Sequence, residues 1–105
     1  MGISAVKSGE KMEINFQDIS PRERYKLLSS TVIPRPIALV SSRGLDGVDN
    51  AAPYSFFNVF SEDPPIVILG LQNKDDGSPK DTTRNILETS EFVVNLIDRK
   101  MAEAM

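Results

Sequence analysis

The stretch that decides the fold spans residues 33–65 and reads IPRPIALVSSRGLDGVDNAAPYSFFNVFSEDPP. Its residues 36–40 are apolar and β-forming, and residues 44–47 then read Gly-Leu-Asp-Gly. Glycine and aspartate tolerate the positive φ angles of a tight hairpin loop, so we expect the chain to turn back on itself there. Residues 50–53 carry little side-chain bulk, which lets a flat ligand approach the backbone and bind its N–H and C=O groups.

The composition limits the class of protein. With 105 residues, of which 40% are hydrophobic, the chain is one globular domain at most. Its net charge of −3 gives no basic stripe for a phosphate backbone, so we expect no nucleic-acid partner. No apolar run approaches the roughly 20 residues that cross a bilayer, and the start lacks the order of a secretory signal. We therefore expect no membrane association and a cytoplasmic location.

Histidine and cysteine are both missing from the sequence. A Ser-His-Asp or Cys-His nucleophile, and a metal site of thiolates or imidazoles, are therefore impossible for this chain alone. We assign no catalytic residue and no metal ligand. The chemistry must come from a cofactor or from lone carboxylates.

The pattern along the chain predicts alternating short strands and helices. We expect a flexible N-terminal arm over residues 1–12, followed by one domain over residues 13–105. Strands are expected at residues 12–16, 36–40, 66–71 and 91–97, and helices at 21–30, at 81–88 and from 98 onward. The apolar strand at 66–71 is predicted to be buried on both sides, and Phe56, Phe57 and Phe60 are predicted to pack in the core. Hairpin signals between short helices favour an antiparallel α+β barrel over a parallel sheet.

Residues 80–84, Lys-Asp-Thr-Thr-Arg, lie where the second helix begins. Free backbone N–H groups, two hydroxyls and two cations converge there, as an anion site requires. The alternative is that Asp81 caps the helix while Lys80 and Arg84 are solvated. Arg35 lies between two prolines and can bind a phosphate bidentately, or it is a surface arginine on a strand edge.

Three pieces, IPRPIALVSS, DGVDNAAPYSFFNVFSEDPP and KDTTRNILETSEFVVNL, together resemble the flavin reductase-like family. The similarity is greatest to the branch with flavoredoxin and the reductase components of two-component monooxygenases, such as nitrilotriacetate monooxygenase component B. This resemblance implies an FMN-binding split β-barrel of antiparallel Greek-key type, mainly β with short helices, and a homodimer. Family members run on for about as many residues again, so the resemblance covers the N-terminal part of such a domain.

The resemblance also implies which residues bind the flavin. Those expected along its ring are Asn50, Ala52, Pro53 and Tyr54, with Ser55 on the ribityl-phosphate side. The other expected cofactor-binding residues are Arg35, Ser41, Ser42, Lys80, Thr82 and Thr83.

The family's activity implies an FMN-binding oxidoreductase of the NAD(P)H:flavin reductase type, with NADH or NADPH as co-substrate. Its reduced flavin would serve a monooxygenase or another electron acceptor. Two alternatives stay open: an FMN-binding electron-transfer protein that oxidises no nicotinamide, and an inactive truncated fragment.

Overall fold

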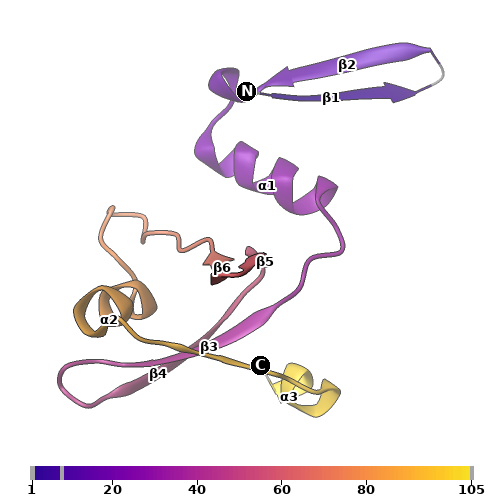
Figure 1. Cartoon of the computed structure of the whole chain (residues 1–105). Helices are drawn as coiled ribbons and strands as arrows, with labels where there is room; N and C mark the ends of the chain where they lie inside the picture. The colour runs from indigo at the N-terminus through magenta and orange to yellow at the C-terminus, as the bar shows by residue number, and fades with distance from the viewer. Residues whose placement is uncertain (1, 8, 105) are drawn as a thin grey trace. The chain divides into compact units, whose positions relative to one another are not determined.

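The structure, a computed structural model, describes residues 2–7 and 9–104. The chain forms two compact units, of which the first ends at Pro34 and the second begins at Arg35 (Figure 1). All strand pairs in the described residues are antiparallel, and the helices are short. This confirms the predicted mainly antiparallel α+β class. The strands lie in three separate small sheets, which do not close into a barrel within the described residues.

The first unit contains a hairpin and a helix. Strand β1 (Gly2–Lys7) pairs with β2 (Glu10–Asn15), and the 3-10 turn η1 (Phe16–Asp18) follows. Helix α1 (Pro21–Thr31) confirms the predicted helix. It begins at the predicted cap, where the Ser20 hydroxyl accepts a hydrogen bond from the Glu23 N–H at 3.2 Å.

The hairpin lies where the sequence predicts an arm without regular structure over residues 1–12. The side-chain pattern of this segment gives no sign of a strand, and it is backbone pairing between β1 and β2 that orders it. Gly9 adopts a positive φ of 80° in the turn between them. Residues 1 and 8 lie outside the described part of the chain.

The second unit is built on a three-stranded sheet. Strand β3 (Ala38–Arg43) lies at its centre, between β4 (Asp49–Tyr54) and β7 (Val93–Asn95). The β3–β4 turn is the one predicted from the glycines, and Gly47 adopts a φ of 80° in it. Cross-strand partners share a face of a sheet, and successive residues alternate between faces.

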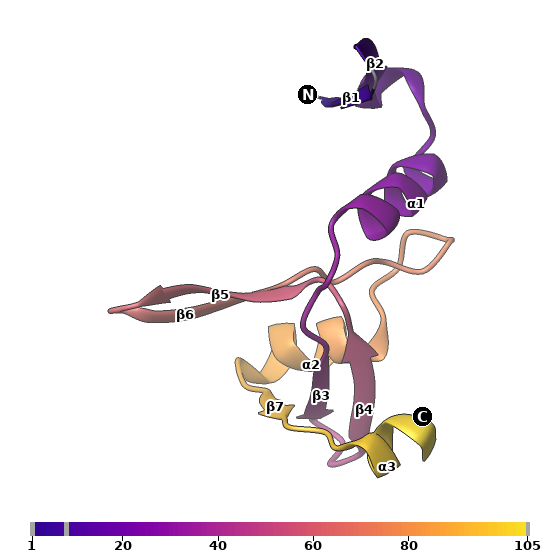
Figure 2. The same ribbon diagram turned by 90° about the vertical axis from the view of Figure 1, so that its right-hand side faces the viewer.

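Helix α2 (Asp81–Thr89) contacts β3 and β4 and lies against one face of them, as Figure 2 shows. On this face Val40 is completely buried, and Thr82 and Asn85 are the buried residues of the helix. The predicted helix at 81–88 is confirmed. Both buried residues of α2 are polar, and their hydrogen bonds matter for the site.

A second hairpin projects away from the three-stranded sheet (Figure 2). It consists of β5 (Phe57–Glu62) and β6 (Pro65–Leu69), which pair with each other in a sheet of their own. Phe60 is 70% exposed and Val67 is 43% exposed. The prediction that 66–71 is buried on both sides is therefore wrong for this chain, as is core packing for Phe60. The apolar pattern is real, but no element of the described residues covers it.

The chain then continues into a short helix, α3 (Arg99–Ala104), which confirms the helix expected from residue 98. The Asp98 carboxylate accepts a hydrogen bond from the Met101 N–H at 2.9 Å at its start. In the described part of the chain, no helix combines the length and the apolar character that crossing a membrane requires.

Candidate functional site

The first turn of α2 has backbone donors without a side-chain cap. Lys80 is the N-cap residue, with extended backbone angles, and its carbonyl accepts the first helical hydrogen bond from the Arg84 N–H at 3.0 Å. A lysine side chain has no acceptor, so it cannot satisfy the N–H groups of this turn as Ser20 does in α1. An anion can bind such donors from outside.

Two side chains of this turn add further capacity. The Thr83 hydroxyl oxygen is shielded from solvent and has no hydrogen-bond partner among the described residues. A shielded hydroxyl without a partner is unusual, and a ligand oxygen can supply one. Arg84 forms an ion pair with Asp81 at 3.2 Å, whereas the exposed Lys80 forms none with any residue that the structure describes. The turn thus offers one cation, one hydroxyl and several N–H groups to a negatively charged group.

Hydrogen bonds join this turn to the sheet. The Asn50 side-chain amide on β4 donates to the Thr82 hydroxyl at 2.8 Å, and the Asn85 amide donates to the Ser42 hydroxyl on β3 at 3.1 Å. Ser42 is 7% exposed and Thr82 is 1% exposed. Two segments that are far apart in the sequence, both predicted to bind the cofactor, are therefore in direct contact.

The predicted residues of the sheet divide between its two faces. Ser42, Asn50 and Ala52 lie on the face that carries α2, because Ser42 is the cross-strand partner of Asn50 and both bond to the helix. Ser41 and Pro53 lie on the opposite face, since neighbours in a strand alternate. One planar ligand therefore cannot contact all of these side chains from one side, whereas it can reach the backbone of β4, an edge strand in the described sheet.

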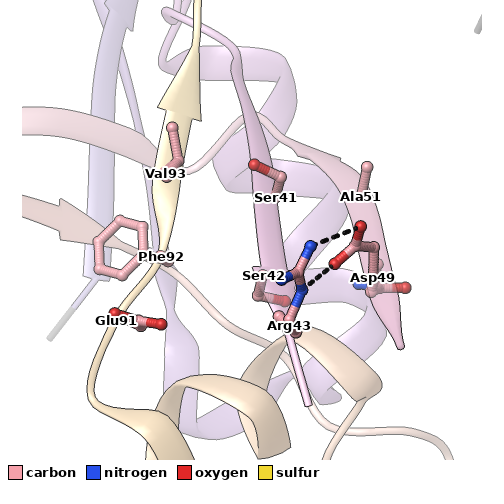
Figure 3. Close-up of a pocket in the computed structure, with 9 residues that line it drawn as sticks. Ser41, Ser42, Arg43, Asp49, Ala51, Glu91, Phe92 and Val93 are labelled. Atoms are coloured by element: carbon pink, nitrogen blue, oxygen red, sulfur yellow. Dashed lines mark hydrogen bonds and ion pairs between the residues drawn. The ribbon is translucent and has the colours of Figure 1, made fainter. Parts of the chain in front are cut away.

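A cavity of about 570 Å³ lies at the ends of the three strands. Residues 41–43, 49–51 and 91–93 line it, and Figure 3 shows Glu91 and Phe92 on the segment that leads into β7. The Arg43 guanidinium donates to the Asp49 carboxylate at 2.6 and 3.2 Å (Figure 3). These hydrogen bonds, and then the positive charge of Arg43, hold the pKa of Asp49 below its ordinary value.

The remaining predicted residues lie before and after these strands. The Arg35 guanidinium lies over the Phe56 ring, 5.5 Å from its centre, which is a cation–π contact. Tyr54 is half-buried opposite Ala38, and Ser55 is half-buried in the bend that follows β4. Their roles toward a ligand stay predictions.

The structure also reveals residues that the sequence reasoning did not select. Asn85 binds Ser42, and the Asn95 amide donates to the Ser41 hydroxyl and the Leu39 carbonyl, both at 3.0 Å. The hydroxyls of Ser41, Ser42 and Thr82 are thus engaged within the protein, while their predicted contacts with a ligand stay untested. The spacing of Asn85 three residues after Thr82, on one helix face, was the available signal.

Comparison with known proteins identifies the fold. The family model described as "Flavin reductase like domain" matches residues 28–105. The chain belongs to the flavin reductase-like family. This flavin reductase-like chain superimposes on the crystal structure of nitrilotriacetate monooxygenase component B from Bacillus cereus with a TM-score of 0.79 and 42% identity, covering 89% of this chain. For the 2-nitrobenzoate 2-nitroreductase NbaA of Pseudomonas fluorescens the TM-score is 0.74, with 42% identity over 88% of this chain.

Curated relatives show the same family likeness. An uncharacterized protein of Halalkalibacterium halodurans is 46% identical over 94 residues, which cover 90% of this chain and 45% of the relative. The uncharacterized protein YwrF of Bacillus subtilis is 49% identical over 85 residues, covering 81% of this chain and 41% of the relative. The chain also covers 46% of the B. cereus component and 44% of NbaA. It therefore spans less than half the length of these relatives.

Proposed function

We propose that this flavin reductase-like chain is the FMN-binding, N-terminal part of an NAD(P)H-dependent flavin reductase. The observation that carries the proposal is the 2.8 Å hydrogen bond between Asn50 and Thr82, which joins the slim β4 segment to the first turn of α2. A flat ring lying along the edge of β4 has the anion-binding turn within its reach. FMN combines a flat ring with one terminal phosphate, and it matches both parts.

In this proposal the phosphate binds at the start of α2. Lys80 supplies a positive charge and the uncapped N–H groups donate hydrogen bonds. The Thr83 hydroxyl, which has no partner among the residues that the structure describes, donates a further hydrogen bond to the phosphate. The residues present therefore fit a phosphate. The backbone of residues 50–53 and the adjoining Tyr54 and Ser55 hold the ring and the ribityl chain.

The chemistry of such an enzyme is hydride transfer between nicotinamide and flavin, for which the protein supplies binding and orientation. A chain without histidine and cysteine suits this role, because direct hydride transfer needs no acid or base from the protein. We propose NADH or NADPH as the co-substrate.

Two further parts of the proposal concern partners. One solved relative is, by its printed name, component B of a monooxygenase, and we propose a monooxygenase or a similar electron acceptor as the partner of the whole protein. We also propose a cytoplasmic homodimer. The exposed apolar side chains of the β5–β6 hairpin support association, because such surfaces are rarely left in contact with water.

The test is a titration of the purified chain with FMN, FAD and riboflavin, followed by flavin fluorescence. We expect FMN to bind most tightly, because the proposed cradle takes a single terminal phosphate. Equal affinity for riboflavin would refute the phosphate assignment. NADH and NADPH consumption in the presence of FMN is then measured, and flavin binding without nicotinamide oxidation would favour an electron carrier.

A further inference from the structure

We propose that Thr82 and Asn85 are positioning residues, which fix the first turn of α2 on the β3–β4 hairpin in the orientation that a phosphate group requires. The proposal rests on the proposed function, since the group to be oriented is the flavin phosphate. Neither residue needs to touch the ligand. Their task is to hold Lys80, Thr83 and the free N–H groups in place.

The four residues of this contact are two neighbours on the sheet and two neighbours on the helix, with similar spacing. Ser42 and Asn50 are direct cross-strand partners in β3 and β4, and Thr82 and Asn85 are three residues apart in α2. Cross-strand side chains start about 4.5–5.5 Å apart, and side chains at i and i+3 of a helix start about 5–6 Å apart. Because these spacings match, both hydrogen bonds, of 2.8 and 3.1 Å, form at once.

Two bonds restrain the helix in a way that one cannot. A single hydrogen bond would let α2 swing about the point of contact, whereas two bonds almost one turn apart prevent this swing. The roll that remains, about the line joining the two bonds, is limited by the packing of α2 on β3 and β4. Thr83 follows Thr82 directly, about 100° further around the helix. The direction of its hydroxyl is therefore set by how Thr82 is held.

Burial makes these bonds hard to replace with water. Thr82 is 1% exposed and Asn85 is 3% exposed, so breaking either bond leaves a polar group without a partner inside the protein. The other side of Asn85 is closed as well. A Cβ atom added to Gly44 would lie 3.1 Å from the Asn85 Oδ1 atom, so the hairpin leaves Asn85 little room to rearrange.

The experiment compares the affinities of the full chain for FMN and riboflavin, at a temperature where circular dichroism shows each variant folded. Thr82→Val keeps the shape but removes the hydroxyl, and Asn85→Ala removes the second bond. We expect both to reduce the preference for FMN over riboflavin by about tenfold, the loss expected for one weakened charged hydrogen bond. Thr82→Ser keeps the hydroxyl and should retain the preference.

Thr89→Val is the matched control. Its hydroxyl lies at the C-terminal end of the same helix, where it donates to the Asn85 carbonyl at 2.7 Å and to the Glu91 carbonyl at 3.4 Å, and it forms no bond to β3 or β4 in the described part of the chain. We expect the preference of this variant to stay within about twofold of the original chain, as for a change outside the site.

The outcomes separate the two proposals. If the original chain shows no preference for FMN, the proposed function fails and the positioning role falls with it. If the preference is present but Asn85→Ala leaves it intact, the positioning proposal alone is overturned, and a loss confined to Thr82→Val would make Thr82 a direct contact. Should the variants not fold, the original chain still decides: FMN, unlike riboflavin, should shift the NMR signals of the Asn85 side-chain amide. Equal shifts with both ligands would overturn the proposal.

Discussion

Replacing Lys80 by alanine tests the assigned phosphate cradle directly. Lys80 is exposed, caps α2 through its backbone alone, and forms no ion pair with the described residues. Its side chain therefore contributes little to folding, and we expect the melting temperature of the ligand-free protein to change by less than about 2 °C. A hydrogen bond to a charged group contributes about 1.5–3 kcal/mol, so Lys80→Ala should weaken FMN binding about 10- to 150-fold.

The assay is quenching of flavin fluorescence with FMN and riboflavin in parallel. Riboflavin lacks the phosphate, and its affinity should be the same for Lys80→Ala and the original chain. Lys74→Ala, in the exposed loop before α2, removes the same charge and serves as the control. The reasoning is refuted if FMN affinity survives in Lys80→Ala, or if FMN and riboflavin lose affinity equally. Lys80 would then be an ordinary solvated residue at a helix start.

Three more predictions concern other parts of the chain. Gly44→Ala should lower the free energy of unfolding by about 0.5–1.5 kcal/mol in urea titrations, because its Cβ would lie 2.7 Å from the Asp46 Oδ1 atom and displace it from the hydrogen bond that it accepts from the Val48 N–H. The pKa of the Asp49 carboxylate should lie below 3.8, its ordinary value, because the carboxylate accepts hydrogen bonds from Arg43. Its contribution to stability is therefore complete above pH 3.8 and is lost as the pH falls through the native pKa. In Arg43→Gln, NMR should show this pKa rising toward 3.8. Light scattering should show an oligomer that dissociates and releases flavin on dilution. Phe60→Lys, which places a charge on the exposed apolar surface of β5, should favour the monomer. A compact, flavin-loaded monomer of the original chain at micromolar concentration would contradict this prediction.

Local sequence signals predicted the elements that depend on local chemistry. Ser20 and Glu23 marked the start of α1, the Gly-Leu-Asp-Gly turn marked the β3–β4 hairpin, and the polar loop before Asp81 marked the start of α2. In each case the residues that form the turn or the cap are neighbours in the chain. Their preferences therefore act whatever the rest of the protein does.

Long-range features could not be predicted in this way. The β5–β6 hairpin was missed as a unit because its apolar residues suit a buried strand as well as an exposed hairpin, and only the surrounding elements decide between them. For the site, the sequence selected Thr82 and Asn50 but not their mutual hydrogen bond. It missed Asn85: the spacing from Thr82 places both residues on one helix face, but the Ser42 hydroxyl that makes Asn85 part of the site lies on another element, 43 residues away.

The central position of β3 has a consequence for how the second unit folds. On one side β3 pairs with the strand that follows it directly, whereas on the other side Asn95 of β7 bonds to Leu39, 56 residues away in sequence. Closing a short loop loses less conformational entropy than closing a long one, and contacts between distant residues form more slowly. The β3–β4 hairpin can therefore form early. Helix α2 then packs on it through Ser42 and Asn50, and β7 pairs with β3 last. The β7 strand, which completes one wall of the cavity, therefore becomes ordered only after the residues between β3 and β7 have folded.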